Sequence, residues 1–270
     1  MNLVIDVGNT EAVLGVFRPG ATEVEGSWRY STAVPRTHHE LRLLIRAFLQ
    51  ERELDPEALN RAVIGSVVPA ETKLLEEALG GLGIEELHIV DSEAGLPIRL
   101  EVDEPRTVGA DRIVNTLAAA RLFARDTIVV DMGTATTYDC ITGDGVFLGG
   151  VIAPGLQAGQ EWLKGHTAKL PRVELRPPEK VIGRRTETCL QSGIFYGAVE
   201  AVDGIVERIK TEWGRPDAFV VSTGGWASVL SPHTRTVEEI HPHLTLLGLE
   251  FAGRVLAGEG QGPEGVAETR

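Results

Sequence analysis

The sequence lacks the features of a secreted or membrane-spanning protein. Its two cysteines, Cys140 and Cys189, lie far apart and form no CxxC pair, so neither a disulfide framework nor a redox centre is expected. No window of 18 residues is apolar throughout, which argues against a membrane-spanning helix. The first ten residues have no basic group and only a short apolar run, unlike a signal peptide. We therefore expect a cytoplasmic protein without a membrane partner.

Basic residues are also scarce. Lysine and arginine total 26 against 39 acidic residues, which gives a formal net charge of -13. Nucleic acids and anionic membranes bind basic surfaces, so neither is expected as a partner. Hydrophobic residues make up 43% of the 270 positions, a composition that suits one large or two medium soluble domains. An acidic chain can still bind an anionic small molecule through backbone N–H groups and a metal ion.

Several common site motifs are missing. The chain contains neither the Walker A pattern nor GxGxxG, so P-loop and Rossmann sites have little support. His241 and His243 stand two residues apart, but no third metal ligand lies near them in the sequence. Surface or loop positions are the simpler interpretation of these histidines.

The hydrophobic pattern predicts an α/β protein in which strands and helices alternate. Strands are expected over residues 3–7, 12–17, 27–31, 62–67, 87–90, 127–131, 136–141, 146–152 and 217–222. Helices are expected after Thr37, over 69–79, 109–125, 186–213 and 244–256, and shortly after residues 155 and 225.

An internal repeat is the most informative feature. Leu3–Thr10 resembles Ile128–Ala135: each is a β-branched strand that ends in Asp-x-Gly and is followed by a returning strand. One Asp-x-Gly is most often only a tight turn. Two copies that lie 125 residues apart, close to half the chain, indicate a duplication with two similar domains facing one cleft.

The chemistry of the repeat suits a triphosphate. Glycine lets the backbone approach a phosphate closely. Asn9, Thr10 and Thr134 can donate hydrogen bonds to phosphate oxygens, and the carboxylates of Asp6 and Asp131 can hold cations. Two such hairpins would grip ATP from both sides.

Further motifs, taken together and in order, resemble the type III pantothenate kinases of the actin/hexokinase/Hsp70-like superfamily. The match runs to about residue 256 and rests on Asp6–Thr10, Gly109–Arg112, Asp131–Thr137, Gly149–Gly155, Ala168–Pro171, Ile182–Thr186, Ser192-Gly193, Thr223–Gly225 and Leu246–Leu249.

The resemblance implies duplicated RNase H-like (actin-like ATPase) domains with mixed five-stranded sheets flanked by helices and an active site in the interdomain cleft. The domains would be 1–114 and 115–257, the second with a long helix at a dimer interface, followed by a disordered tail at 258–270. The implied activity is ATP-dependent phosphorylation of pantothenate to 4'-phosphopantothenate, the first step of coenzyme A biosynthesis. It implies a homodimer that uses Mg²⁺ with ATP and a monovalent cation, K⁺ or NH₄⁺.

Site roles follow from the same resemblance. Asp111 would be the general base, and Arg112 suits the pantothenate carboxylate as a charge-assisted donor. Thr186 would contact pantothenate across the dimer interface, Asp131 would hold the monovalent cation, and Asp6 would lie in the magnesium region. The substrate site would also include Gly109 and Ala110, and Gly224 and Gly225 would lie near the adenosine. The ATP contacts would be Asp6, Val7, Gly8, Asn9, Thr10, Glu11, Ala12, Val13 and Thr134.

Some alternatives stay open. Taken alone, Asp111-Arg112 is more typical of a charge pair at a helix N-terminus, and Thr186 could cap the long helix. Val102 stands where the family usually has tyrosine, and Glu11 is an acid beside the first phosphate loop, facing phosphate, solvent or a metal. The competing functions are a kinase for another small acceptor, such as a sugar, a polyphosphate hydrolase, and a non-catalytic nucleotide-binding regulator.

Overall fold

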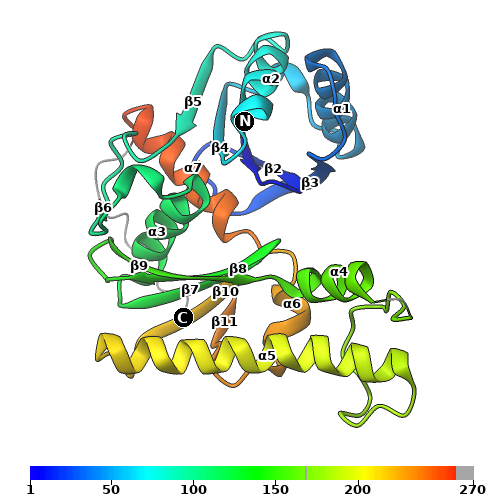
Figure 1. The fold of residues 1–270 in the computed structure, drawn as a ribbon. Helices are drawn as coiled ribbons and strands as arrows, with labels where there is room; N and C mark the ends of the chain where they lie inside the picture. Colours follow the sequence, from blue (N-terminus) through cyan, green and yellow to red (C-terminus); the bar gives the residue numbers. More distant parts are fainter. Residues whose placement is uncertain (168, 260–270) are drawn as a thin grey trace. The chain divides into compact units, whose positions relative to one another are not determined.

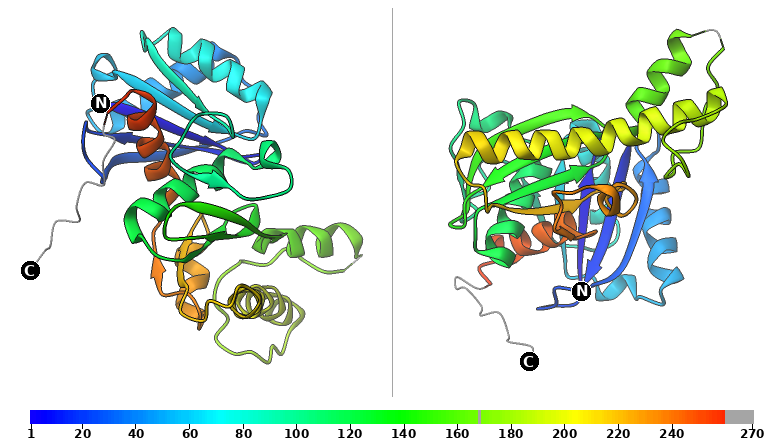
Figure 2. Two further views of the ribbon diagram at one scale, coloured as in Figure 1. Left: turned by 90° about the vertical axis from the view of Figure 1, so that its left-hand side faces the viewer. Right: turned by 90° about the horizontal axis from the view of Figure 1, so that it is seen from below.

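The computed structural model describes residues 1–167 and 169–259 and separates into two compact units. The first unit contains Met1–Arg99, Asp103–Leu122 and the chain from Thr245. The second contains Leu100–Val102 and Phe123–Leu244. Each unit is an α/β body built on one sheet (Figures 1 and 2). None of the helices in the described residues is both long and apolar enough to cross a bilayer.

The first unit has a five-stranded sheet in the order β3-β2-β1-β4-β5. Strands β1, β2 and β3 form an antiparallel meander, and β4 and β5 add in parallel beside β1. The strand bounds are Asn2–Val7, Glu11–Phe17, Val24–Ser31, Arg61–Ser66 and Glu86–Val90. Leu3, Ile5 and Val7 alternate along β1 and enter one hydrophobic core, as the two-residue period of a strand requires.

Two pairs of helices pack against this sheet. Helices α1 (His38–Glu51) and α2 (Pro69–Gly80) fill the core on one face. Thr37 begins α1 through a capping box with Glu40. Helices α3 (Ala110–Phe123) and α7 (Leu244–Leu256) pack against glycine positions of the same sheet, where a Cβ on Gly65 would lie 3.0 Å from Leu249 of α7.

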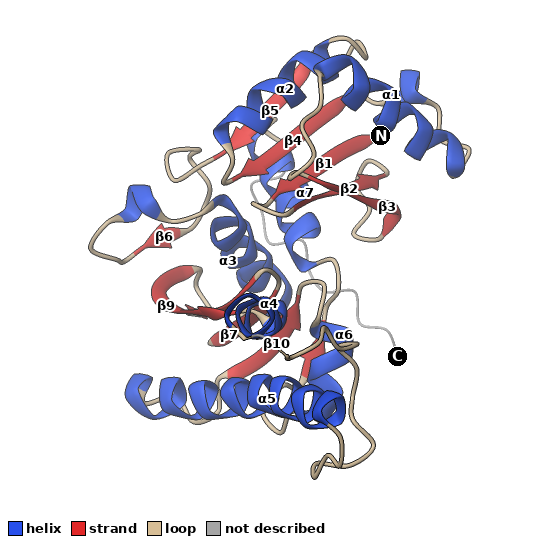
Figure 3. Ribbon diagram, turned by 45° about the vertical axis from the view of Figure 1, so that its right-hand side comes forward, coloured by secondary structure: helices blue, strands red, loops and turns tan. Residues whose placement is uncertain are grey.

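The second unit has a six-stranded sheet in the order β11-β10-β7-β8-β9-β6. Its strands are β6 (Arg99–Leu100), β7 (Thr127–Met132), β8 (Ala135–Ile141), β9 (Val146–Pro154), β10 (Phe219–Thr223) and β11 (Glu239–Ile240). The long helix α5 (Thr186–Trp213) runs along this sheet (Figure 3). Its Phe195, Val199 and Val202 are part of the core. Shorter helices, α4 (Leu156–His166) and α6 (Ala227–Leu230), complete the unit.

The two units repeat one topology, which confirms the predicted fold class. In each, an antiparallel meander (β1-β2-β3 or β7-β8-β9) is joined by a parallel strand beside its first member, β4 or β10. The prediction of five strands is wrong for the second sheet, which has six. The additional strand β6 has two residues, too few for a hydrophobic alternation to reveal it.

The compact units also differ from the predicted domain bounds. The boundary at residue 114 falls inside α3, which stays with the first unit as far as Leu122 because it packs against α7. There a Cβ on Gly248 would lie 2.2 Å from the carbonyl oxygen of Val114, so glycine is needed for the approach. Within the predicted tail, Glu259 is described and pairs with Arg61. Residues 260–270 lie outside the described residues.

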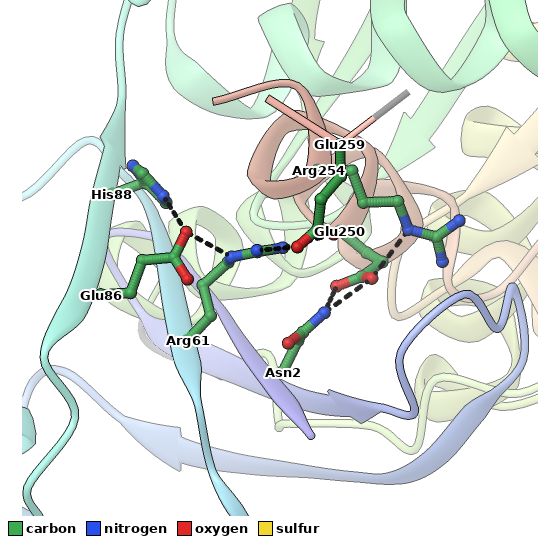
Figure 4. A network of polar contacts seen from close by, with 7 residues as sticks. All are labelled: Asn2, Arg61, Glu86, His88, Glu250, Arg254 and Glu259. Atoms are coloured by element: carbon green, nitrogen blue, oxygen red, sulfur yellow. Dashed lines mark hydrogen bonds and ion pairs between the residues drawn. The ribbon is translucent and has the colours of Figure 1, made fainter. Parts of the chain in front are cut away.

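A buried carboxylate fastens α7 to the start of β1 (Figure 4). The side chain of Glu250 is fully buried and accepts hydrogen bonds from Nδ2 of Asn2 and Nε of Arg254, both at 3.0 Å. Burial raises the pKa of Glu250 above its ordinary value, against the opposing effect of those two donors. Arg254 also donates to the carbonyl oxygen of Ala21.

An ion-pair cluster around Arg61 lies beside it. The Arg61 guanidinium, whose side chain is 5% exposed, donates to Glu86 at 2.9 Å and to Glu259 at 2.5 Å. Its hydrogen bonds lower the pKa of Glu259. For Glu86 burial acts to raise the pKa, but the hydrogen bonds from Arg61 and His88 outweigh it and the pKa is lowered. Both carboxylates therefore stabilise the fold above the ordinary carboxyl pKa and lose this contribution on acidification.

We expect Arg61→Met to lower the melting temperature at pH 7, because it removes the partner of two carboxylates. The free energy of unfolding should fall by about 1 kcal/mol, the upper end of the range measured for ion pairs with exposed partners. The difference from the parent protein should shrink as the pH falls below about 4.5, where Glu86 and Glu259 protonate in the unfolded chain. Thermal melts from pH 3.5 to 7 measure this, with Arg18→Met, from the exposed Arg18–Glu25 pair, as the control. A difference independent of pH would contradict the assignment.

Candidate active site

The predicted first phosphate loop is a short turn at the end of β1. Gly8–Thr10 connect β1 to β2, and the N–H of Gly8 donates to the carbonyl oxygen of Glu11 at 3.0 Å. Asn9 and Thr10 are exposed, as a ligand-binding turn requires. Asp6 is half-buried two residues before the glycine, between Val13 of β2 and Gly65 of β4 in the sheet.

The flanking residues of this loop have different surroundings. Val7 and Ala12 are buried in the core, so only their main chain could contact a nucleotide. Val13 is half-buried. Glu11 is exposed and pairs with Arg29 of β3 at 3.5 Å, and this arginine offsets its charge. The acid beside the loop therefore belongs to a surface ion pair.

Asp111 lies in the first turn of α3, where the helix dipole favours an anion. Its Oδ1 accepts the N–H of Arg112 at 2.9 Å. A Cβ on Gly109 would lie only 2.4 Å from that oxygen, so the glycine leaves room for the carboxylate. Asp111 and Arg112 are half-buried, and Ala110 is buried.

The segment Gly109–Arg112 and the first loop share one edge of the first sheet. The position of a Cβ on Gly109 is 3.4 Å from Val67, the residue after β4. The N–H of Val67 in turn donates to the carbonyl oxygen of Val7, where β1 ends, at 3.1 Å. The structure therefore brings the predicted base and the predicted phosphate loop together at the carboxyl ends of β1 and β4.

The second loop joins β7 to β8 and is packed by two glycines. The N–H of Gly133 donates to the carbonyl oxygen of Ala135 at 2.9 Å. A Cβ on Gly155 would lie 2.3 Å from the carbonyl oxygen of Thr134, and one on Gly224 would lie 2.4 Å from Oδ1 of Asp131. Asp131 is half-buried and Thr134 is exposed. Neither glycine can therefore gain a side chain without moving this loop.

Thr186 lines an apolar groove of the second unit. The groove has a volume of about 600 Å³ and runs between the start of α4 and α5, from Gly155 past Leu156, Leu190 and Ile194. Thr186 does not cap α5, because Arg185 is the N-cap residue and Thr186 is the first helical residue. The hydroxyl of Thr188 accepts the N–H groups of Arg184 and Arg185 instead, at 3.1 and 3.2 Å.

The family model for type III pantothenate kinases matches residues 2–208. The chain belongs to the type III pantothenate kinase family. It is 43% identical over 253 residues to the type III pantothenate kinase of Moorella thermoacetica, a match that covers 93% of this chain and 98% of the relative. It is 41% identical, over 93% of this chain and 97% of the relative, to the enzyme of the same name from Geobacter sulfurreducens.

Solved structures support the fold of this family member. The ethanolamine utilization protein EutJ from Carboxydothermus hydrogenoformans matches with a TM-score of 0.53 at 18% identity, covering 92% of this chain and 88% of its own. A ROK family glucokinase from Streptomyces griseus, solved with glucose and AMPPNP, matches with a TM-score of 0.51 at 12% identity, covering 94% of this chain and 98% of its own. The chain therefore has the fold of actin/hexokinase/ROK-like ATPases.

The structure places Val102, the position at which the family resemblance predicts a tyrosine. Val102 is half-buried in the second unit, 3.6 Å from the position of a Cβ on Gly149 of β9. The packing roles of Gly155 and Gly224 could not be predicted from the sequence. Both belong to the glycine motifs of the family, so the motifs mark the residues although they do not reveal what each glycine touches.

Proposed function

We propose that this kinase transfers the γ-phosphoryl group of MgATP to the 4'-hydroxyl of pantothenate. The observation that carries the proposal is Asp111, held beside Gly109 at the sheet edge that also bears the loop Gly8–Thr10. Asp111 accepts the hydroxyl proton while the hydroxyl oxygen bonds to the γ-phosphorus. The bond from that phosphorus to the β–γ bridging oxygen breaks, and its electron pair leaves with ADP. The products are 4'-phosphopantothenate and ADP.

The remaining site residues bind and orient the two substrates. The exposed side chains of Asn9, Thr10 and Thr134 donate hydrogen bonds to phosphate oxygens. The guanidinium of Arg112, one residue after the base, binds the pantothenate carboxylate. Thr186 contributes its hydroxyl to the pantothenate site of a second protomer.

The cation sites are built on single carboxylates. No group of three His, Cys, Asp or Glu side chains within residues 1–167 and 169–259 could hold a metal ion. Mg²⁺ commonly takes one or two carboxylates plus substrate phosphates, which suits the half-buried Asp6 at the end of β1. Asp131, in the equivalent place on β7, would hold K⁺ or NH₄⁺. Held there, these cations would neutralise phosphate charge, and the protein would contribute the carboxylates of Asp6 and Asp131.

The test is an assay of ADP release with Mg²⁺, K⁺ and pantothenate. Rapid release should require pantothenate, and it should fall sharply when K⁺ is replaced by tetramethylammonium. Asp131→Asn should remove the response to K⁺. Turnover only with another acceptor, such as a sugar, would show that pantothenate is not the substrate. ADP release with no acceptor present would indicate a hydrolase. Nucleotide binding without any turnover would favour a non-catalytic regulator.

A homodimer is part of the proposal. The groove beside Thr186 is apolar, and Val181 and Ile182, just before α5, are 64% and 82% exposed. Exposed apolar surface of this kind is typical of protein interfaces. Light scattering should give twice the chain mass of 29.1 kDa. Gly193 lines the groove with open space around it, so Gly193→Trp should give a folded monomer, and an unchanged dimer would place the interface elsewhere.

A further inference from the structure

Thr32 holds the first phosphate loop at two points. It follows the last residue of β3, Ser31, and lies beside the turn Gly8–Thr10. Its hydroxyl donates to the carbonyl oxygen of Gly8 at 3.0 Å, and its N–H donates to the carbonyl oxygen of Thr10, also at 3.0 Å. One residue therefore fixes the carbonyl oxygens at both ends of the turn.

This contact determines the direction of a main-chain donor. No peptide bond among the described residues is cis, and a trans peptide unit is planar with its C=O and N–H pointing in opposite directions. Because the Gly8 carbonyl points to Thr32, the N–H of Asn9 in the same unit points away from Thr32. Main-chain N–H groups of a glycine turn are the usual ligands of a phosphate. The Thr32 hydroxyl thus fixes the direction of a main-chain N–H in the predicted phosphate loop.

We propose that Thr32 is a positioning residue for the nucleotide phosphates, acting through the Gly8–Asn9 peptide. This inference rests on the proposed function, since it assigns Gly8–Thr10 to ATP. Thr32 itself need not touch the nucleotide. Without the Thr32 hydroxyl, the Gly8–Asn9 peptide would be free to rotate. Each binding of a nucleotide would then have to restore the orientation in which the Asn9 N–H meets the phosphate.

The duplicated unit supports its loop at the equivalent position by other means. The pairing of Glu11 with Ser31 places Thr32 opposite Thr10. The pairing of Ala135 with Pro154 places Gly155 opposite Thr134 in the same way. At Gly155 the backbone packs directly against the second loop, whereas at Thr32 a side-chain hydroxyl makes the contact with the first loop. Each loop is therefore braced from the third strand of its meander.

The segment that carries Thr32 is itself anchored. Nη1 of Arg36 donates to the carbonyl oxygens of Ser31 at 2.5 Å and Val34 at 3.1 Å. The Arg36 guanidinium also lies 5.2 Å from the ring centre of Tyr30, whose hydroxyl donates to Glu71 of α2 at 2.8 Å. These contacts hold the end of β3 in place, and with it the backbone that carries Thr32.

The experiment compares Thr32→Val, Thr32→Ser and Thr211→Val. Calorimetry with MgATP and no acceptor gives the nucleotide Kd, so the result does not depend on which acceptor is phosphorylated. Thr32→Val should weaken ATP binding about tenfold, the change expected for one net hydrogen bond. Thr32→Ser retains the hydroxyl and should bind within about twofold of the parent protein. Thr211→Val, which removes the same type of bond, to the carbonyl of Glu207 in α5, should bind normally.

Kinetics and melting separate positioning from folding. Thr32→Val should raise KM for ATP with KM for pantothenate and the melting temperature nearly unchanged. Parental ATP binding by a folded Thr32→Val protein would overturn the inference. So would a Thr32→Ser protein as weak as Thr32→Val. Absence of pantothenate phosphorylation by the parent protein would instead refute the proposed function, while the Kd comparison would still show whether Thr32 positions the loop.

Discussion

Asp111→Asn is expected to lower kcat for pantothenate phosphorylation by about 10²–10⁴-fold, the usual contribution of a positioned general base. Asparagine has nearly the same shape and can still accept the N–H of Arg112, so the local packing against Gly109 should survive. It cannot take the hydroxyl proton. Steady-state assays with saturating MgATP and pantothenate measure the loss.

The matched control is Asp103→Asn, which removes an exposed carboxylate from the connection that leads into α3. This variant should keep parental kcat. Calorimetry should give parental ATP affinity for Asp111→Asn, since the proposed role concerns the acceptor. Retention of more than about a tenth of the parental kcat would contradict the assignment of Asp111 as the base, because general-base catalysis contributes more than this.

The second large effect is expected at Gly155, where alanine should nearly abolish activity. Its Cβ would lie 2.3 Å from the carbonyl oxygen of Thr134 and 2.6 Å from that of Gly133, and both are main-chain atoms that cannot turn aside. Overpacking of this kind costs about 1–3 kcal/mol of stability. The second loop must also shift, and a displacement near 1 Å in a catalytic site can cost about 10²-fold in rate.

Gly165→Ala provides the control towards the other end of α4, outside the apolar groove. No neighbouring side chain or other segment lies within 4 Å of a Cβ there, so the methyl group has room. Alanine in a helix should stabilise the protein by about 0.5–1 kcal/mol relative to glycine. Melting curves and kcat for the two variants test the argument together. If Gly155→Ala were as active and as stable as Gly165→Ala, the packing of Gly155 on the second loop would not matter for function.

The regular elements could be predicted from the sequence because their hydrophobic periods are long enough to read. Helix α5 was predicted over 186–213 and spans those residues. The two-residue strands β6 and β11 have no such period, and only pairing with a neighbour makes them strands. The predicted boundary at residue 114 came from the family resemblance, whereas the compact units follow packing, which returns α7 to the first unit.

The site was predictable as a set of motifs and not as a set of contacts. Asp6, Asp111 and Asp131 could be selected because family motifs mark them. The sequence did not predict that Glu11 pairs with Arg29, since that contact depends on the register of β2 with β3. Thr32 was missed for the same reason: the pairing of two strands brings its hydroxyl to Gly8, and no motif spans the distance. The roles of the site residues stay predictions that the variants above test.

The division of the chain between the units has a consequence for its synthesis on the ribosome. The second unit is almost continuous, Phe123–Leu244 with three earlier residues, so nearly all of its contacts become available before α7 is made. The first unit is begun first but needs α7, whose Leu246 and Leu249 cover Gly15 and Gly65. Domains usually complete folding in the order in which they emerge. Here we expect the reverse order. Nascent chains in which residue 244 has left the ribosome while α7 is still inside it should protect the second sheet from protease, and the first sheet should remain open to cleavage.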